Sequence, residues 1–155
     1  MPPTFRTHSP AQTQRAAARL GRLLQAGDVV GLVGQLGAGK TWFVKGLAQG
    51  LGLAPAHIAS PSFTIINEHA GGRLPLYHVD LYRLADPSEL DELGLGELLS
   101  GEGVSAVEWI DRFPQVAPAE WLEVLIDFAG AQTRRLTVRG LGARGQTLAR
   151  VWLGA

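Results

Sequence analysis

The sequence predicts an α/β fold of three layers, in which a mixed, partly parallel central sheet is flanked by helices. An apolar run over 28–33, bounded by turn residues, is typical of a strand buried on both faces. A glycine-rich loop over 34–39 and a helix over 40–51 follow it directly. Strands outnumber helices in the rest of the chain, which favours a parallel core with antiparallel edges. We expect a single domain over 1–155, because no repeat, linker or low-complexity tract divides the chain.

A helix is expected before the first buried strand. The Ser9 hydroxyl can cap it, Pro10 suits the first helical position, and Gln12 stands where a capping box requires it. The apolar face of this helix continues to Gly27 through three leucines, Leu20, Leu23 and Leu24.

The middle of the chain predicts a hairpin, with strands over 61–68 and 74–82 around the turn Ala70-Gly71-Gly72. Alternation along the second strand places His78, Asp80 and Tyr82 on one face. The remaining expected elements are a short acidic helical stretch over 89–99, a strand over 104–107 that ends on Glu108, strands over 122–128 and 135–139, and a segment over 145–153 that is either helix or strand.

Composition excludes several classes of protein. Hydrophobic residues make up 46% of the chain and charged residues 18%, which excludes wholesale disorder. The net charge is zero, whereas proteins that mainly coat DNA or an anionic membrane carry a basic surplus, so we expect neither partner. The absence of cysteine excludes disulfides and thiol chemistry. No signal peptide and no apolar run of ~18 residues is found, so a soluble, cytoplasmic protein is expected.

The residues that carry chemistry begin at Gly34. Gly34-Gln35-Leu36-Gly37-Ala38-Gly39-Lys40-Thr41 fits the pattern G-x-x-x-x-G-K-[ST] of a phosphate-binding P-loop. Glycines let successive N–H groups point inward at a β-phosphate, beside the N-terminus of the following helix. Lys40 can reach the β- and γ-phosphate oxygens, and the Thr41 hydroxyl can ligate Mg²⁺. The chain has only two lysines, so the pattern is rare by chance, and the expected fold is a P-loop NTPase-like three-layer domain.

A P-loop also needs an acidic group for the metal, usually at the end of a buried strand. Glu108 ends the strand over 104–107, and Asp80 lies on the polar face of the hairpin strand. Without the loop, either would be an ordinary strand-end or surface carboxylate. Trp42 and Trp109 adjoin the loop and Glu108, although both also suit core packing.

Base preference is partly readable from the lysines. The guanine-selecting pattern Asn-Lys-x-Asp cannot occur, because the two lysines follow Gly39 and Val44, so ATP or ADP is the expected nucleotide.

The histidines at 8, 57, 69 and 78 show no metal-ligand spacing and suit surface or internally satisfied positions. Four arginines could include one that stabilises phosphate charge, although solvated arginine is commoner: Arg83, Arg112, Arg134 and Arg135.

With these residues, the chain resembles the TsaE (YjeE) family, small bacterial P-loop ATPases of tRNA threonylcarbamoyladenosine synthesis. Ser60-Pro61-Ser62-Phe63-Thr64 resembles the family's S-P-T-[FY]-T segment, and His78-Val79-Asp80-Leu81-Tyr82-Arg83-Leu84 resembles its H-x-D-x-Y-R-L signature. Val107-Glu108-Trp109 resembles its [VI]-E-W signature. Together with the P-loop, these motifs follow the family's order over roughly 9–140, and the last two are far more specific than a P-loop alone.

The resemblance implies the role of each site residue. Thr41 and Glu108 would ligate Mg²⁺, and Asp80 would act near the γ-phosphate, ordering water or the metal's own waters. Trp109 would support the site beside Glu108. Lys40, Asp80 and Glu108 are thus the expected catalytic residues. The expected ATP/ADP contacts are Gly34, Gln35, Leu36, Gly37, Ala38, Gly39, Lys40, Thr41, Trp42, Ser62 and Trp109.

The resemblance also implies partners. ATP hydrolysis, weak in the isolated protein, would sustain turnover of a complex with homologues of TsaB and TsaD. The protein would contact tRNA indirectly, through this complex.

The chain departs from the family at three places. Ser62 stands where Thr is usual, Trp42 replaces a smaller residue, and Ile110-Asp111-Arg112 follows Trp109 in place of Pro-Glu. These changes remove no expected ligand.

Two other functions stay open at this point. A small-molecule kinase would need an acceptor pocket and an arginine-bearing lid, for which Arg83 and Arg112 are the only nearby suggestions. A binding module could instead sense ATP against ADP without useful turnover.

Overall fold

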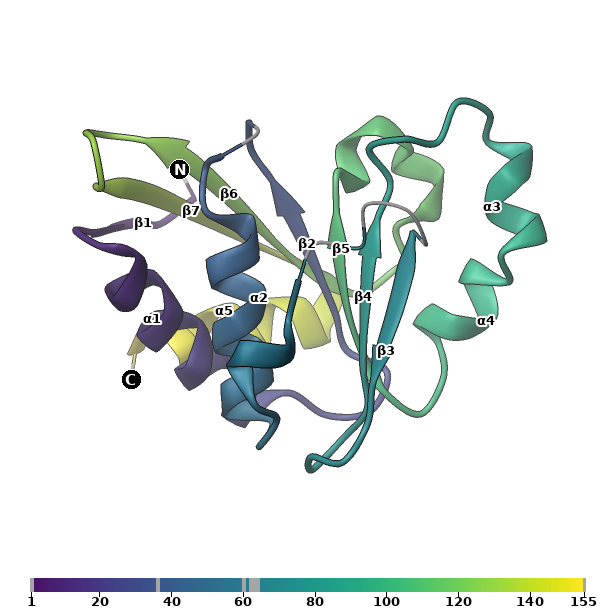
Figure 1. Ribbon diagram of the computed structural model, residues 1–155, viewed down its shortest axis with the longest axis horizontal. Coiled ribbons are helices and arrows are strands. Elements are labelled where there is room, and N and C mark those ends of the chain that lie inside the picture. Colours follow the sequence, from purple (N-terminus) through teal and green to yellow (C-terminus); the bar gives the residue numbers. More distant parts are fainter. Residues whose placement is uncertain (1, 36, 60, 62–64, 155) are drawn as a thin grey trace.

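The structure, a computed structural model, describes residues 2–35, 37–59, 61 and 65–154. Within that part of the chain, seven strands form one sheet in the order β1-β7-β6-β2-β5-β4-β3 (Figure 1). The strands are β1 (Thr4–Thr7), β2 (Val29–Val33), β3 (Ile66–His69), β4 (Leu76–Asp80), β5 (Val104–Glu108), β6 (Trp121–Phe128) and β7 (Arg134–Leu141).

The centre of the sheet is parallel and its edges are antiparallel, as the sequence predicts. β2 pairs in parallel with β5 and β6, and β4 pairs in parallel with β5. β7 and β1 extend one side in antiparallel pairing, and β3 closes the other side as the predicted hairpin with β4. At the carboxyl ends of the parallel strands, Leu32 lies opposite Glu108, and Glu108 lies opposite Asp80. Three chain segments therefore meet at one edge of the sheet.

Helices cover both faces of the sheet and complete the predicted three layers (Figure 1). Val30 and Leu32 of β2 join a core cluster with one group of helices, whereas Val29 of the same strand joins a second cluster on the opposite face. The first face carries α1 (Pro10–Leu23), α2 (Lys40–Gly50) and α5 (Gly142–Gly154). The second carries α3 (Ser88–Glu92), α4 (Leu95–Leu99) and the 3-10 turns η2 (Ile110–Arg112) and η3 (Pro114–Val116); a further 3-10 turn, η1 (Pro55–His57), follows α2.

The first helix begins as the sequence predicts. Ser9 Oγ accepts a hydrogen bond from the backbone N of Gln12 at 3.1 Å, and Pro10 is the first helical residue. The Gln12 side chain accepts from the backbone N of His8 at 2.7 Å. These contacts satisfy amides that would otherwise be left open at the helix start.

Helices α1 and α2 approach each other at backbone distance because glycines line their contact. A Cβ atom at Gly46 would lie 2.2 Å from the Gln14 carbonyl oxygen and 2.5 Å from the Ala17 Cβ. A Cβ atom at Gly50 would lie 2.4 Å from the Ala18 carbonyl oxygen. The contact thus fixes the position of α2, the helix that follows the glycine-rich loop.

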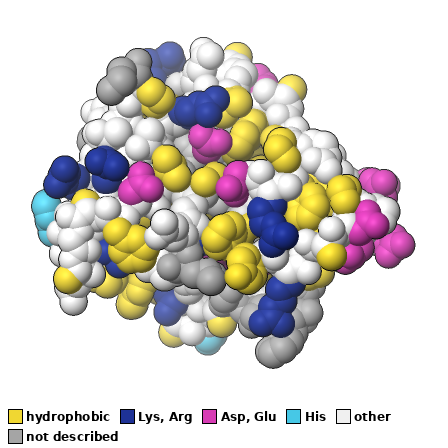
Figure 2. All heavy atoms as spheres, turned by 90° about the horizontal axis from the view of Figure 1, so that it is seen from above, with side chains coloured by type: hydrophobic (Ala, Val, Ile, Leu, Met, Phe, Trp, Pro, Cys, Tyr) yellow, Lys and Arg dark blue, Asp and Glu magenta, His cyan; other side chains and the backbone are white. Residues whose placement is uncertain are grey.

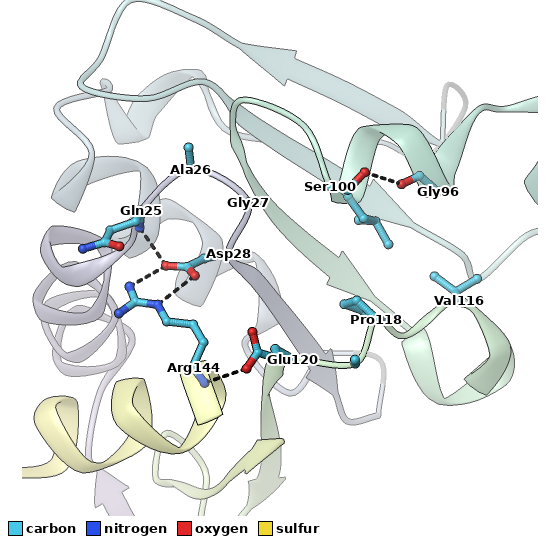
Figure 3. Close-up of a pocket in the computed structure, with 12 residues that line it drawn as sticks. Gln25, Ala26, Gly27, Asp28, Gly96, Ser100, Val116, Pro118, Glu120 and Arg144 are labelled. Carbon is cyan, nitrogen blue, oxygen red and sulfur yellow. Dashed lines mark hydrogen bonds and ion pairs between the residues drawn. The ribbon is translucent and has the colours of Figure 1, made fainter. Parts of the chain in front are cut away.

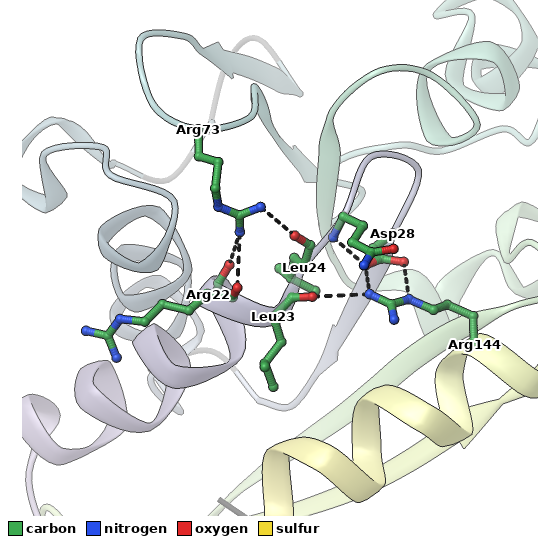
Figure 4. Close-up of polar contacts among 8 residues, drawn as sticks. Arg22, Leu23, Leu24, Asp28, Arg73 and Arg144 are labelled. Atoms are coloured by element: carbon green, nitrogen blue, oxygen red, sulfur yellow. Dashed lines mark hydrogen bonds and ion pairs between the residues drawn. The ribbon is translucent and has the colours of Figure 1, made fainter.

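Two arginines tie the end of α1 to distant parts of the chain (Figure 4). Arg73, from the hairpin turn, donates to the carbonyl oxygens of Gly21 and Leu24, both at 2.9 Å. Arg144, from α5, forms a bidentate pair with Asp28 at 3.0 and 2.7 Å. Charged donors therefore satisfy carbonyls at the end of α1 and a buried carboxylate just before β2.

The sequence-based expectations fail at a few elements. The edge strand β1 was not expected, because Thr4–Thr7 is short and carries a single large apolar residue. The helical stretch over 89–99 is two helices, since Gly94 takes a left-handed backbone at φ 67° between them. Elsewhere the structure decides an open alternative: the segment over 145–153, expected as helix or strand, is helical within α5. β4 ends at Asp80, so Tyr82 lies beyond the strand, and residues 62–64 of the expected first hairpin strand lie outside the described residues.

No helix in the described part of the chain combines the length and the apolar character needed to cross a membrane.

We predict that Gly46→Ala lowers the free energy of unfolding by about 1–3 kcal/mol, because the added methyl must push apart two helix backbones. Gly96→Ala is the matched control: it lies within α4, and a Cβ there meets nothing within 4 Å. This second change should leave stability unchanged or raise it by up to about 1 kcal/mol. Denaturant unfolding of both variants measures the difference, and equal stability of the two would contradict the close helix contact.

Candidate functional site

The glycine-rich loop lies between β2 and α2, at the carboxyl edge of the parallel strands. Gly37 and Gly39 take left-handed backbones at φ 79° and 108°, which favour glycine. A Cβ atom at Gly34 would lie 2.5 Å from the Ile126 carbonyl oxygen, so this position needs glycine for close approach to β6. Gly39 is the N-cap of α2 and offers no side chain to cap it. The first amides of α2 are thus available to an anion.

Lys40, the first residue of α2, is buried and bonds to its own loop. Its Nζ donates hydrogen bonds to the carbonyl oxygens of Gly34 at 2.5 Å and Gln35 at 3.1 Å. It also lies 3.9 Å from the centroid of the Trp109 ring, within the range of a cation–π contact. The ammonium group is therefore held over the loop, where a phosphate bound to the loop would meet it.

The charge on Lys40 is not fully compensated. Burial of the side chain lowers the pKa of Lys40, and the carboxylates of Glu108, Asp80 and Asp111 act in the opposite direction. Burial is the larger influence, so the charged form lacks part of the solvation that water would give it. An anion placed against Nζ would restore that stabilisation.

A cavity of about 290 Å³ opens beside this lysine. It brings together residues from the loop, the start of α2 and the ends of β4 and β5, which the sequence had proposed as one site. Its lining residues are Gly37, Gly39, Lys40, Thr41, Trp42, Asp80, Glu108 and Trp109. Figure 2 shows this edge of the molecule, where apolar, basic and acidic side chains are intermixed and acidic ones gather toward the end that carries α3.

The two carboxylates are adjacent in the register of β4 and β5. Glu108 is buried, at 4% exposure, and lies 2.5 Å from Nε2 of His78. Asp80 is partly exposed and accepts a hydrogen bond from the backbone N of Tyr82 at 2.9 Å. The structure thus gives the two groups different surroundings: one is enclosed and one faces solvent.

Trp109 turns the chain sharply after Glu108. Its backbone is left-handed at φ 62°, a conformation that costs a bulky residue about 1–3 kcal/mol. Its amide donates to the Leu32 carbonyl at 3.1 Å, and its ring packs against Tyr82 with centroids 5.0 Å apart. Such strain is typical of functional sites, and here it brings the ring over Lys40.

The donor set suits a magnesium ion that arrives with phosphate oxygens. The Thr41 hydroxyl and the carboxylates line one cavity, and Mg²⁺ prefers such oxygen ligands. In the described residues, no group of three or more His, Cys, Asp or Glu side chains could hold a metal by itself. A metal would therefore be bound by few protein ligands together with phosphate, as is common for Mg²⁺.

Other expected contacts lie around this cavity or outside the described residues. The carbonyl oxygens of Gly34 and Gln35 accept hydrogen bonds from Lys40, and Ala38 is buried. Leu36 and Ser62 lie outside the described residues.

Arg134, one of the four arginines that could stabilise phosphate charge, makes a specific contact with the loop. Its Nε donates to the Ala38 carbonyl oxygen at 2.9 Å, and its guanidinium lies 4.4 Å from the Phe128 ring centroid. Arg135, the next residue, is exposed and faces Asp127 at 3.6 Å. The sequence could not separate the two, because only the fold brings the β6–β7 hairpin to the loop.

His78 is the second residue that the sequence did not assign. It is completely buried and contacts Glu108, which agrees with the internally satisfied position expected as one alternative, although no role in the site was predicted for it. The available signal was the strand alternation, which places it two residues before Asp80 on the same face.

A larger cavity, of about 630 Å³, lies at the opposite edge of the sheet, before β2 and β6 (Figure 3). Its charged groups are already engaged with each other: Arg144 pairs with Asp28, and its backbone N donates to Glu120 at 3.2 Å. Ser100 donates to the Gly96 carbonyl at 3.1 Å. The residues that line this larger cavity include no lysine, so the loop cavity is the better candidate for chemistry.

The sheet order, the glycine cradle and the lysine at the start of α2 define an α/β protein with a P-loop NTPase-like fold. A family model described as "Threonylcarbamoyl adenosine biosynthesis protein TsaE" matches residues 7–136, which include every site residue named above. The chain belongs to the TsaE family, as its motifs suggest.

Similar proteins carry the same name. The tRNA threonylcarbamoyladenosine biosynthesis protein TsaE of Bacillus subtilis is 44% identical over 144 residues, which cover 93% of this chain and 89% of the relative. The protein of that name from Treponema pallidum is 41% identical over 132 residues, covering 85% and 96%. The crystal structure of Bacillus subtilis YdiB matches with a TM-score of 0.81 and 37% identity, covering 99% of this chain and 95% of that one.

We predict that Arg134→Ala loosens the loop, because the Ala38 carbonyl loses a charged hydrogen-bond donor. Hydrogen–deuterium exchange of the amides at 37–39 should become about tenfold faster, which corresponds to about 1.4 kcal/mol. Arg135→Ala should leave that exchange unchanged, since its side chain faces Asp127 instead. Equal exchange in both variants would show that Arg134 does not brace the loop.

Proposed function

We propose that the protein is a Mg²⁺-dependent ATPase that acts as an accessory component of tRNA threonylcarbamoyladenosine synthesis. The observation that carries this proposal is the single cavity that joins Lys40 and Thr41 of the loop to Asp80 and Glu108. Membership of the TsaE family supports the pathway, because its members are named for it. We further propose that homologues of TsaB and TsaD are its partners, that tRNA is met through them, and that all act in the cytoplasm.

Each proposed role follows from the position of the residue. The loop amides and Lys40 would hold the phosphates of ATP, with Nζ exchanging its bonds to loop carbonyls for phosphate oxygens. Thr41 and Glu108 would hold Mg²⁺, which when bound neutralises charge that develops on the transferred phosphoryl group. Asp80, the more exposed carboxylate, would order the attacking water. The proposal treats the whole chain as one nucleotide-binding domain and favours ATP over GTP.

The first test measures phosphate release from ATP and GTP with Mg²⁺, alone and with TsaB and TsaD homologues from the same source. We expect slow release from ATP alone and a clear increase with the partners. Lys40→Ala should abolish both activities, because the loop loses the ammonium that meets the phosphates. Lys45→Ala is the matched control, since Lys45 lies on the same helix and contacts the Trp42 ring rather than the loop.

The same experiment separates the other two candidate functions. Phosphate that appears on a small molecule instead of in water would indicate a kinase. Tight nucleotide binding with no turnover above the Lys40→Ala blank, even with partners, would indicate a sensor of ATP against ADP. Either outcome contradicts the proposed ATPase.

We predict that the two carboxylates have different roles, Glu108 in Mg²⁺ binding and Asp80 in turnover. Glu108→Gln should raise the Mg²⁺ concentration needed for half-maximal ADP binding at least tenfold, because a charged metal ligand is lost. Asp80→Asn should keep ADP binding within a few-fold of the wild type and reduce partner-stimulated turnover about 100-fold or more. Calorimetry and phosphate release measure these effects, and the reverse pattern would exchange the two assignments.

A further inference from the structure

The contact between His78 and Glu108 joins the ends of two central strands beneath the candidate site. His78 is 0% exposed and Glu108 is 4% exposed, and the distance from Nε2 to Oε2 is 2.5 Å. Glu108 also lines the loop cavity, whereas His78 is not among its lining residues. The imidazole therefore contacts the carboxylate from behind, on the side away from the cavity.

The hydrogen bond is not needed to pair the strands. β4 and β5 are already aligned over five residue pairs, from Leu76 opposite Val104 to Asp80 opposite Glu108. The presence of a buried polar ring points to a requirement of the carboxylate that it contacts.

Within the part of the chain that the structure describes, the imidazole makes one hydrogen bond. Its Nδ1 is buried and has no hydrogen-bond partner among the described residues, so Nε2 carries its only hydrogen bond there. An ionised Glu108, the form that ligates a metal, can only accept, so Nε2–H must donate to it. This arrangement fixes one oxygen of a carboxylate that lines the cavity.

The geometry points to His78 as a positioning residue for the magnesium ligand Glu108. This inference rests on the proposed function. By holding Oε2, His78 restricts the rotation of the carboxylate that lines the cavity. Partners that orient a metal ligand in this way typically account for 10–100-fold in metal affinity.

The test compares His78→Leu, which removes the donor, with His78→Gln, whose amide can donate from a position close to Nε2. Calorimetry measures ADP binding over a series of Mg²⁺ concentrations and also in EDTA. In His78→Leu, the Mg²⁺ concentration for half-maximal enhancement should rise 10–100-fold, while ADP binding in EDTA stays within about twofold. In His78→Gln, the Mg²⁺ concentration for half-maximal enhancement should return most of the way to the wild-type value.

A double variant makes the assignment specific. If His78 acts through Glu108, adding His78→Leu to Glu108→Gln should produce no further change in Mg²⁺ dependence. Additive effects of the two changes would overturn the inference, as would a His78→Leu protein with wild-type Mg²⁺ dependence.

Thermal unfolding of each variant distinguishes positioning from folding. If His78→Leu does not fold, His78→Asn, whose shorter side chain cannot reach Glu108 in the same way, replaces it. An impaired Asn variant beside a restored Gln variant supports the inference, and equal behaviour of the two overturns it. If ADP binding by the wild type does not depend on Mg²⁺, the proposed function fails together with this inference. If the wild type shows a Mg²⁺ dependence and the His78 variants show the same one, the inference alone fails.

Discussion

The burial of a carboxylate at the end of β5 is the constraint on which the rest of the site depends. A carboxyl group with 4% exposure is tolerated only where polar groups face it. His78 supplies a direct contact from β4, and Lys40 places a positive charge nearby from α2. The parallel register of β4 and β5 adds Asp80 beside Glu108. Residues from β4, β5 and α2 therefore satisfy one another only when these three segments are packed together.

The position of α2 is fixed by packing as well as by charge. Glycines at the α1 contact let the two helices approach at backbone distance, and Gly34 allows the loop to pass close to β6. On the other side, Trp109 turns back over Lys40 through a left-handed residue. The lysine is thus enclosed by its own loop and by an aromatic ring, and its place does not depend on flexible surface contacts.

The local parts of the site were predictable, and the long-range parts were not. The loop, Lys40 and Thr41 follow from consecutive residues, and Glu108 follows from its place at the end of an apolar run. His78 and Arg134 contact residues 30 and 96 positions away, and local sequence shows only that His78 shares a strand face with Asp80. The edge strand β1 forms only because β7 offers it a partner. The break between α3 and α4 could have been predicted from Gly94, which favours a left-handed backbone.

The two hydrogen bonds from Lys40 to its loop carbonyls have a consequence for selectivity. The ammonium group has three N–H donors, so these two bonds leave one donor for an anion in the cavity, and each further contact with Nζ requires that a carbonyl bond be exchanged. A small anion with few oxygens, such as sulfate or free phosphate, offers little beyond that exchange, because it reaches few of the loop amides at once. A polyphosphate chain spans the amides and the ammonium group together. The bonds between Lys40 and the loop carbonyls are therefore expected to favour a polyphosphate over small anions.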